Sequence, residues 1–382
     1  MHVCLDGRCI TDHFPGIGRY VHSLVGALAD LAPDDRFSVL VTPGQRSGRF
    51  PLSLLAERPN VFLVPVGAGV FNPVGQWRCR SAIQRTGADL FHATYWLGPW
   101  WPGLPTVLTC YDLIGRRAPG MVPSLKGRLL DAAVWLSLRR AERVLAISTA
   151  VADDLVTTGL AAAGRVRVTP LAASSEFQPP SAAAVEALKV RLHLPPRYLL
   201  YVGIDKPHKN LATLIRAWGR LLGRRTELTD GTRLVLAGPR DRRYRRLTDA
   251  YVAHFARTDA VMILGQVDES DLPALYGGAA AFAFPSRHEG FGLPVLEAMA
   301  CGTPVVVSNA TSLPEVAGDA ALLLDPLDVS GWSAALERVL DNPELADDLR
   351  SRGQAQAARF TWRATAEATL AAYRELQEAA PG

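Results

Sequence analysis

The feature that most constrains the fold is a regular alternation of short, continuously apolar runs with longer helical patterns, clearest after residue 197. The apolar runs of this half lie at 198–203, 233–238, 261–264, 281–285, 304–308 and 321–324. Helical patterns lie among them at 211–222, 243–255, 271–277, 293–300 and 329–340. Apolar runs without polar alternation are typical of strands buried on both faces, joined through helices into a parallel sheet. The pattern predicts an α/β fold whose ligands bind at the carboxyl ends of the strands.

The first half of the chain repeats this alternation less regularly. Its apolar runs lie at 37–41, 61–64, 90–92, 106–109, 144–147 and 166–169, with helical patterns at 20–31 and 124–141. A segment rich in proline and serine, 174–181, separates the two halves. A length of 382 residues also favours two domains. We therefore predict domains at 1–175 and 176–360, followed by a helix in 361–382.

Composition excludes several classes of protein. With 48% hydrophobic and 20% charged residues, the chain is typical of a globular protein and not of a disordered one. The start of the chain has no apolar segment typical of a signal peptide, and no run approaches the roughly 20 apolar residues of a membrane-spanning helix. The cysteines are scattered and form no metal-binding pair, which favours a reducing, cytoplasmic setting; they are Cys4, Cys9, Cys79, Cys110 and Cys301.

The segment 284–303 carries the clearest chemical signal. A buried strand ends at Pro285, a glycine-rich loop follows, and a helix begins near Leu293. Glycine lets the backbone approach a ligand, and a helix N-terminus presents N–H groups and a positive dipole end to a phosphate. Glu289 in the loop and Glu297 in the helix are suited to hold sugar hydroxyls. The alternative is a packing unit with two solvated glutamates.

A second glycine loop, 203–210, also leaves a buried strand and opens a helix. It contains Lys206 and Lys209, and lysine is a compact charge suited to phosphate oxygens. Exposed lysines are more often ordinary soluble surface. Both loops, however, are expected at the carboxyl edge of the same sheet, so together they predict a site for a diphosphate.

These motifs resemble those of the GT-B glycosyltransferases of family 4. The resemblance rests on two glutamates with seven residues between them, Glu289 and Glu297, on the stretch that follows as far as Val305, on 312–321, and on Gly16-Ile-Gly18-Arg19-Tyr20. It covers nearly the whole chain and is strongest in 198–326. It implies two Rossmann-like, doubly wound domains that face a central cleft, with the acceptor domain first and the nucleotide-sugar donor domain second. It also implies that the final helix, in 361–382, crosses back onto the first domain.

The resemblance also implies an activity and its residues. The chain would be a retaining hexosyltransferase with a nucleoside diphosphate sugar as substrate, no cofactor and no bound metal. Residues expected to bind the donor are Gly16, Gly18, Lys206, Lys209, Glu289, Gly290, Phe291, Gly292, Leu293 and Glu297. Residues expected to act in catalysis are Lys209, Glu289, Asp112 and His92. GDP-mannose is the first donor we expect and UDP-sugars the next, with a lipid-linked or polysaccharide glycan, such as lipopolysaccharide, as acceptor.

The chain departs from the family pattern at two positions. Ile204 stands where relatives often have arginine, and we expect Lys206 to replace that cation. Tyr111 stands where many relatives have histidine, and His92 is the residue expected to serve instead. Asp112 keeps its place beside that position.

Two further segments suggest binding surfaces. The rings of Tyr95, Trp96, Trp100 and Trp101 follow a strand end and are suited to stack on acceptor sugars; packing of a long loop is the alternative. The basic, aromatic-bearing pattern 124–143 is suited to a peripheral membrane contact through the first domain, although a core-facing helix with a solvated basic edge is the more common case. No nucleic-acid-binding module accompanies the basic residues.

Other functions remain open from the sequence alone. Gly16 and Gly18 are close to a dinucleotide fingerprint, with Asp34 and Asp35 near the expected offset, and nicotinamide binding would favour an oxidoreductase. A pair of carboxylates also suits a glycosidase, which would release sugar without a nucleotide. A relative that binds its ligand, or hydrolyses it, without transfer is the third alternative.

Overall fold

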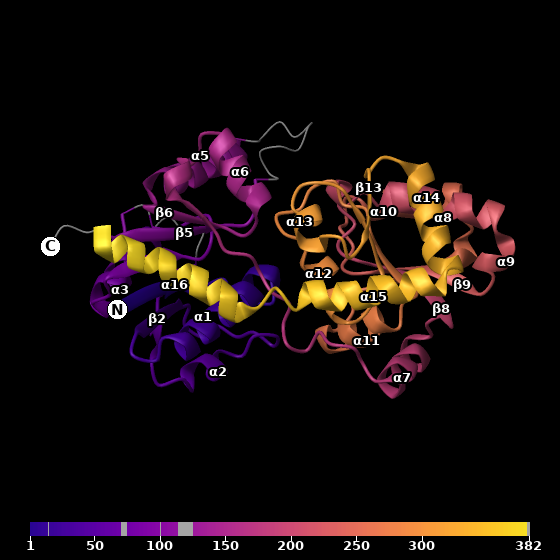
Figure 1. Ribbon diagram of the computed structural model, residues 1–382. Helices are drawn as coiled ribbons and strands as arrows, with labels where there is room; N and C mark the ends of the chain where they lie inside the picture. Colours follow the sequence, from indigo (N-terminus) through magenta and orange to yellow (C-terminus); the bar gives the residue numbers. More distant parts are fainter. Residues whose placement is uncertain (14, 70–74, 100, 114–124, 380–382) are drawn as a thin grey trace. The chain divides into compact units, whose positions relative to one another are not determined.

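The structure of the chain is a computed structural model that describes residues 1–13, 15–69, 75–99, 101–113 and 125–379. It divides into two compact units, which are treated separately (Figure 1). Unit 1 consists of 1–171 together with 361–382, and unit 2 of 172–360.

Unit 1 is built on a seven-stranded parallel sheet with the order β3-β2-β1-β4-β5-β6-β7. Its strands are β1 (His2–Asp6), β2 (Arg36–Val41), β3 (Val61–Pro65), β4 (Leu90–Ala93), β5 (Thr106–Cys110), β6 (Arg143–Ala146) and β7 (Val166–Val168). Val3 of β1 pairs with Phe37 on one side and Leu90 on the other, and all three side chains are fully buried or nearly so. The apolar runs of the first half therefore form the interior of one sheet, as a buried parallel sheet requires.

Helices cover both faces of this sheet. They are α1 (Pro15–Leu31), α2 (Leu52–Ala56), α3 (Gly75–Thr86), α5 (Leu125–Arg140), α6 (Thr149–Thr157) and α16 (Trp362–Ala379), with a short 3-10 turn at Ala163–Arg165. The strand order reverses direction at β1, so right-handed crossovers place α1 and α2 on one face and α3, α5 and α6 on the other. Figure 1 shows α5 and α6 above the strands of this unit and α1, α2 and α16 below them.

A buried network of hydrogen bonds connects the last helix, α16, to the rest of unit 1. The Nδ1 atom of His92 lies 2.6 Å from the Tyr373 hydroxyl, and its Nε2 lies 2.8 Å from the Thr109 hydroxyl. The Tyr20 hydroxyl lies 2.9 Å from the same Thr109 oxygen. Burial lowers the pKa of His92 to about 3, so the imidazole is neutral at ordinary pH. These bonds join α16 to β4, β5 and α1.

Unit 2 contains a six-stranded parallel sheet with the order β10-β9-β8-β11-β12-β13. Its strands are β8 (Arg197–Val202), β9 (Thr232–Ala237), β10 (Val261–Gly265), β11 (Ala281–Phe284), β12 (Val305–Ser308) and β13 (Leu322–Leu324). The sheet agrees with the apolar runs predicted from the sequence, within one or two residues at each end. Both units are thus doubly wound, Rossmann-like α/β domains.

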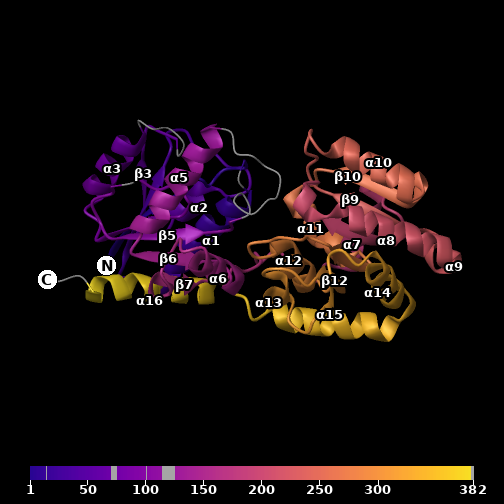
Figure 2. The same ribbon diagram turned by 90° about the horizontal axis from the view of Figure 1, so that it is seen from above.

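The helices of unit 2 also cover both faces of the sheet. The α-helices are α7 (Ala182–Leu192), α8 (Leu211–Arg224), α9 (Thr226–Thr229), α10 (Arg245–Phe255), α11 (Leu272–Gly277), α12 (Leu293–Ala300), α13 (Leu313–Ala317), α14 (Val329–Asp341) and α15 (Pro343–Ala357). Short 3-10 turns occupy Pro207–Lys209, Thr258–Ala260 and Glu269–Asp271. In Figure 1, α8, α10 and α14 lie on one side of the strands and α11, α12 and α15 on the other. Figure 2 shows α15 beside α12, against which it packs.

Candidate functional site

The candidate site of unit 2 lies where two neighbouring strands end. β8 and β11 pair in parallel, so the loops that follow them, 203–210 and 285–292, leave the same edge of the sheet. The first loop leads into α8 and the second into α12. This edge is where doubly wound sheets bind ligands.

An ion pair joins the two loops. The Nζ atom of Lys209 lies 2.6 Å from Oε1 of Glu289, and the side chains are 14% and 12% exposed. The ammonium also lies 5.1 Å from the centroid of the Phe284 ring. The structure therefore brings together two of the four residues that the family resemblance implied for catalysis.

Backbone contacts hold the loops against each other. The N–H of Arg287 donates to the carbonyl of His208 (2.8 Å), and the Ser286 hydroxyl donates to the same oxygen (3.2 Å). The side-chain amide of Asn210, a residue with a left-handed backbone (φ 56°), donates to the Pro285 carbonyl (3.0 Å). The hydrogen bonds of His208 and Asn210, the residues before and after it in the chain, thus position Lys209.

The Glu289 loop is also supported by the segment before α13. The N–H of Glu289 donates to the Thr311 hydroxyl (3.0 Å). The buried Ser312 hydroxyl donates to the carbonyls of Glu289 (3.1 Å) and Phe291 (2.7 Å). These supports were missed as site residues, although Ser312 lies in one of the segments that carried the family resemblance.

The N-terminus of α12 opens directly from this loop. Its N-cap is Gly292 at φ 117°, and a Cβ there would lie 2.7 Å from the Leu313 side chain, so glycine is required. Among the residues that the structure describes, no side chain caps the helix, and Pro294 occupies its first turn. An uncapped helix N-terminus next to a lysine is suited to bind an anion.

His208 lies between the charged groups of the first loop. Burial, reinforced by Lys209, lowers the pKa of its imidazole to about 4 against the opposing charge of Glu289. The positive charge of this loop at neutral pH therefore comes from its lysines. The lowered pKa has the sign expected for a base beside a cation.

Lys206 is half-buried on the side of this loop that approaches the segment after β9. The hydrogen-bonded Arg243 lowers the pKa of Asp241 to about 2, and Lys206 contributes to the same shift. The neighbouring Asp205 accepts a hydrogen bond from the Asp241 N–H (2.5 Å). Lys206 thus lies near the Asp241 carboxylate. That Lys206 replaces the arginine found in relatives at the position of Ile204 remains a prediction.

Glu297 faces the interior of unit 2. Its side chain is 5% exposed, and Oε2 accepts a hydrogen bond from the buried Tyr276 hydroxyl (3.0 Å). The expected role in holding a ribose requires this buried carboxylate to be reached by a ligand. It remains a prediction.

In unit 1 the glycine motif at 16–18 is helical. Pro15 begins α1, so Gly16 and Gly18 lie in its first turn, ahead of the helical pattern expected from residue 20. Gly16 is exposed, whereas a Cβ on Gly18 would lie 3.0 Å from the Phe50 ring. Proline favours the first turn of a helix, which explains the earlier start.

His92 does not fit the catalytic role predicted for it. The side chain is fully buried, and both ring nitrogens are occupied by the hydroxyls of Tyr373 and Thr109. Asp112 is partly buried just after β5. Tyr111, beside it, donates its hydroxyl proton to the Thr94 carbonyl (2.7 Å).

The aromatic loop divides into two parts. The rings of Tyr95 and Trp96 are stacked 4.8 Å apart and pack with Ile17 at the start of α1. Trp101 instead lies under Arg140, directly before β6, and therefore at the amino end of that strand. Trp101 is thus not at the carboxyl edge where we had expected it to meet an acceptor. Trp100 lies outside the described residues.

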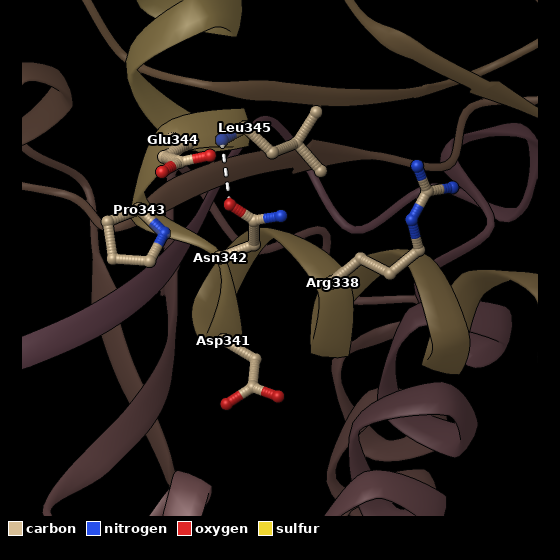
Figure 3. A pocket seen from close by; sticks show the side chains of 6 residues that line it. All are labelled: Arg338, Asp341, Asn342, Pro343, Glu344 and Leu345. Atoms are coloured by element: carbon tan, nitrogen blue, oxygen red, sulfur yellow. Dashed lines mark hydrogen bonds between the residues drawn. The ribbon is translucent and has the colours of Figure 1, made fainter.

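A hollow of about 670 Å³ lies elsewhere on unit 2, at the turn between α14 and α15 (Figure 3). It is lined by Arg338, Asp341, Asn342, Pro343, Glu344 and Leu345. Asp341 pairs with Arg225 (3.0 Å), which directly follows α8, whereas Lys209 precedes that helix. Fourteen helical residues, roughly 21 Å, therefore separate the hollow from the candidate site.

No group of three or more His, Cys, Asp or Glu side chains in the described parts of the chain is arranged to hold a metal ion. Within the same residues, no helix is long and apolar enough to cross a membrane.

Two family descriptions match this sequence. Residues 186–356 match the glycosyl transferases group 1, and residues 15–172 match the glycosyl transferase 4-like domain. These matches correspond closely to unit 2 and to the larger segment of unit 1.

Similar proteins are glycosyltransferases as well. The O-antigen chain mannosyltransferase B of Escherichia coli is 36% identical over 71% of this chain and 70% of its own length. A D-inositol 3-phosphate glycosyltransferase of Saccharomonospora viridis is 32% identical over 85% of this chain and 82% of its own. The serotype-specific mannosyltransferases WbdA of Escherichia coli are 31% to 33% identical, but this chain spans only about a third of their length.

Solved structures agree on the fold. A sucrose-phosphate synthase from Thermosynechococcus elongatus aligns over 100% of both chains with a TM-score of 0.76 and 23% identity. The Anabaena protein HepE in complex with UDP-glucose aligns over 99% of this chain and 100% of its own, with a TM-score of 0.74 and 19% identity. These neighbours have the GT-B fold.

Proposed function

Because this chain belongs to the GT-B glycosyltransferases of family 4, we propose that it transfers a hexose, mannose in the first instance, from a nucleoside diphosphate sugar to a glycan acceptor. The observation that carries the proposal is the Lys209–Glu289 pair, 2.6 Å apart beside the uncapped N-terminus of α12. The acceptor we propose is a growing polysaccharide or lipid-linked glycan, in keeping with the O-antigen mannosyltransferase among the relatives.

The roles of the residues follow from their charges and positions. Lys209 and the N–H groups at the start of α12 would bind the diphosphate and stabilise the negative charge that grows on it as the glycosidic bond of the donor breaks. Glu289, held by Thr311 and Ser312, would accept hydrogen bonds from the hydroxyls of the transferred sugar. Donor binding would therefore exchange the Lys209–Glu289 bond for two bonds to the ligand.

We propose further that transfer retains the anomeric configuration and requires no bound metal. A lysine and a helix N-terminus supply the positive charge that a divalent cation provides to other diphosphates. Binding and orientation of the reactants then account for much of the rate enhancement.

The donor we place first carries GDP, in line with the mannosyltransferases among the relatives. A UDP-sugar is the second candidate, because a structural neighbour binds UDP-glucose. The inositol phosphate glycosyltransferase, which matches a larger share of the chain, keeps a phosphorylated polyol open as an alternative acceptor.

A thermal-shift screen with GDP, UDP, dTDP and ADP tests the donor. A nucleotide at a hundred times its Kd should stabilise the protein by about 2.7 kcal/mol, and we expect GDP to produce the largest rise in Tm. A rise with UDP alone would replace GDP in the proposal. No rise with any of the four, together with NADH binding, would overturn the glycosyl-transfer proposal.

A further inference from the structure

Among the residues that the structure describes, three other than glycine have a left-handed backbone: His193, Asn210 and Thr311. Asn210 and Thr311 both lie at the candidate site of unit 2. Asparagine adopts this conformation readily, whereas a β-branched residue such as Thr311, at φ 50°, is a rare and strained exception. Thr311 is therefore the residue of the site whose backbone requires an explanation.

Thr311 occupies a tight turn that leads from β12 into α13. The N–H of Leu313 donates to the Ala310 carbonyl (3.1 Å), which closes the turn. The central residues have φ 50° at Thr311 and φ −81°, ψ −10° at Ser312. These values fit a type II′ turn, whose first central position is ordinarily glycine. The sequence thus has threonine where the backbone favours glycine.

Packing does not compensate for this strain. The Thr311 side chain is exposed, so its methyl group gains little from burial. Its hydroxyl instead accepts a hydrogen bond from the Glu289 N–H (3.0 Å). Glycine would fit the turn without strain but has no hydroxyl to offer. The bond to Glu289 therefore explains why threonine stands in this turn.

Two consecutive hydroxyls thus hold the backbone of Glu289 on both sides. Thr311 accepts from its N–H, and Ser312 donates to its carbonyl (3.1 Å). The turn and the Glu289 loop leave the same edge of the sheet, because β11 and β12 pair in parallel. With both backbone groups fixed, the direction of the side chain is fixed as well. Supporting hydrogen bonds of this kind hold a functional group close to its productive geometry.

We propose that Thr311 is a positioning residue, which keeps a strained backbone so that the Glu289 carboxylate is oriented toward the transferred sugar. The inference rests on the proposed function, in which Glu289 accepts hydrogen bonds from the sugar hydroxyls. It adds that unit 2 gives up some stability at this turn to orient one side chain, as strained residues at functional sites do. Lys209 is positioned by its own loop, so a change at Thr311 should affect the sugar more than the diphosphate.

Variants at Thr311 separate the strain from the hydroxyl. Thr311→Gly and Thr311→Val both lack the hydroxyl, but only valine keeps the strained, branched side chain. The glycine variant should therefore have the higher Tm of the two, by roughly 2–4 °C. His193, exposed at the end of α7 with φ 51°, offers the matched control. His193→Gly and His193→Val should show the same order of Tm, and both should transfer sugar like the wild type.

Binding of the donor separates a positioning role from a merely structural one. Both Thr311→Gly and Thr311→Val should bind the nucleotide sugar about three- to tenfold more weakly and transfer it more slowly, since one hydrogen bond is lost. Calorimetry should show that the free nucleoside diphosphate binds as before, and Thr311→Ser should recover most of the loss. Equal weakening of both ligands would overturn the proposal. Transfer at the wild-type rate by Thr311→Gly, or a glycine variant no more stable than the valine variant, would overturn it as well.

Failure of the proposed function would give a different result, because the wild type itself would then transfer no sugar from GDP-mannose, UDP-glucose or another nucleotide sugar. Amide hydrogen exchange needs no substrate and tests the inference in either case. The Glu289 N–H should exchange faster in Thr311→Val than in the wild type and in Thr311→Ser, because only the valine variant lacks its acceptor. Equal exchange in all three proteins would overturn the inference.

Discussion

Each of the two sheets presents a close ion pair at its carboxyl edge, but the pairs differ in their burial. In unit 1, Asp6 is the last residue of β1 and its carboxylate lies 2.6 Å from the Arg8 guanidinium, with side chains 1% and 4% exposed. In unit 2, Lys209 and Glu289 are also 2.6 Å apart but 14% and 12% exposed. Distance alone therefore does not separate a structural pair from a binding pair.

The surroundings of the two pairs explain the difference. Arg8 binds both carboxylate oxygens of Asp6 and donates to the Ala68 carbonyl (3.3 Å), so the pair is satisfied within the protein. Burial lowers the pKa of Arg8, but the charge and hydrogen bonds of Asp6 outweigh it and raise the pKa overall. Lys209 and Glu289 come from different loops beside the N-terminus of α12. A bound ligand can there take the place of Glu289 as the partner of Lys209, and of Lys209 as the partner of Glu289. We infer that the first pair stabilises the fold and the second binds the donor.

The largest effect on stability is expected from Arg8→Met. It leaves the Asp6 carboxylate buried without its partner, which should lower the free energy of unfolding by about 3–5 kcal/mol. Urea denaturation measures this change. Arg58→Met is the control, because Arg58 makes the same two-bond contact with Asp30 at the surface and should cost at most about 1 kcal/mol. Equal losses in both variants would remove burial as the distinction.

The complementary effect, on activity, is expected from Lys209→Ala. Loss of one group that stabilises the departing diphosphate should lower kcat by roughly 10²–10³-fold, about 3–4 kcal/mol in the barrier, while Tm changes little. Steady-state transfer from the donor found in the nucleotide screen measures it. Lys189→Ala removes a lysine from the surface pair with Glu186 and should retain full activity. A Lys209 variant that unfolds but transfers sugar normally when folded would assign this pair to stability.

A pH titration of stability examines the interior of unit 1. The pKa of His92 is about 3 in the folded protein, below the ordinary value of 6.5, so below pH 6.5 the unfolded chain binds a proton that the folded one does not. Stability should therefore fall as the pH drops, by up to about 3 kcal/mol between pH 6.5 and 4. His92→Gln should flatten this part of the curve, and His208→Gln, whose pKa is also lowered, serves for comparison. An unchanged slope in His92→Gln would contradict the buried network.

The smallest effect is expected from Ser312→Ala. This removes a hydroxyl that donates to the carbonyls of Glu289 and Phe291, worth about 1 kcal/mol, and loosens the donor loop without removing a charge. We expect a severalfold rise in the KM for the donor with kcat nearly unchanged. Initial rates over a range of donor concentrations measure both constants. A fall in kcat as large as that of Lys209→Ala would give Ser312 more than a supporting role.

The sequence predicted the parts of the fold that local patterns determine. The expected helix at 293–300 begins and ends where α12 does, because a glycine, a proline and an apolar run define it locally. The meeting of Lys209 with Glu289 was likewise implied by two loops at one edge of a parallel sheet.

Contacts between distant segments were not predictable in the same way. His92 pairs with Tyr373, 281 residues away, and no local pattern indicates that α16 would cover it. The direction of the loop after β4 was missed as well, because aromatic spacing does not fix where a loop runs. That loop carries Trp101 from the carboxyl end of one strand to the amino end of another.

The most direct test of the account is a calorimetric titration of GDP and of guanosine into the wild type and Lys209→Ala, with UDP and uridine substituted if the screen selects them. The account predicts that the nucleoside diphosphate binds the variant at least roughly tenfold more weakly, since a charge-assisted contact is worth about 1.5–3 kcal/mol, while binding of the nucleoside does not change. Equal affinity of the diphosphate for both proteins would contradict a phosphate site at the carboxyl edge of unit 2.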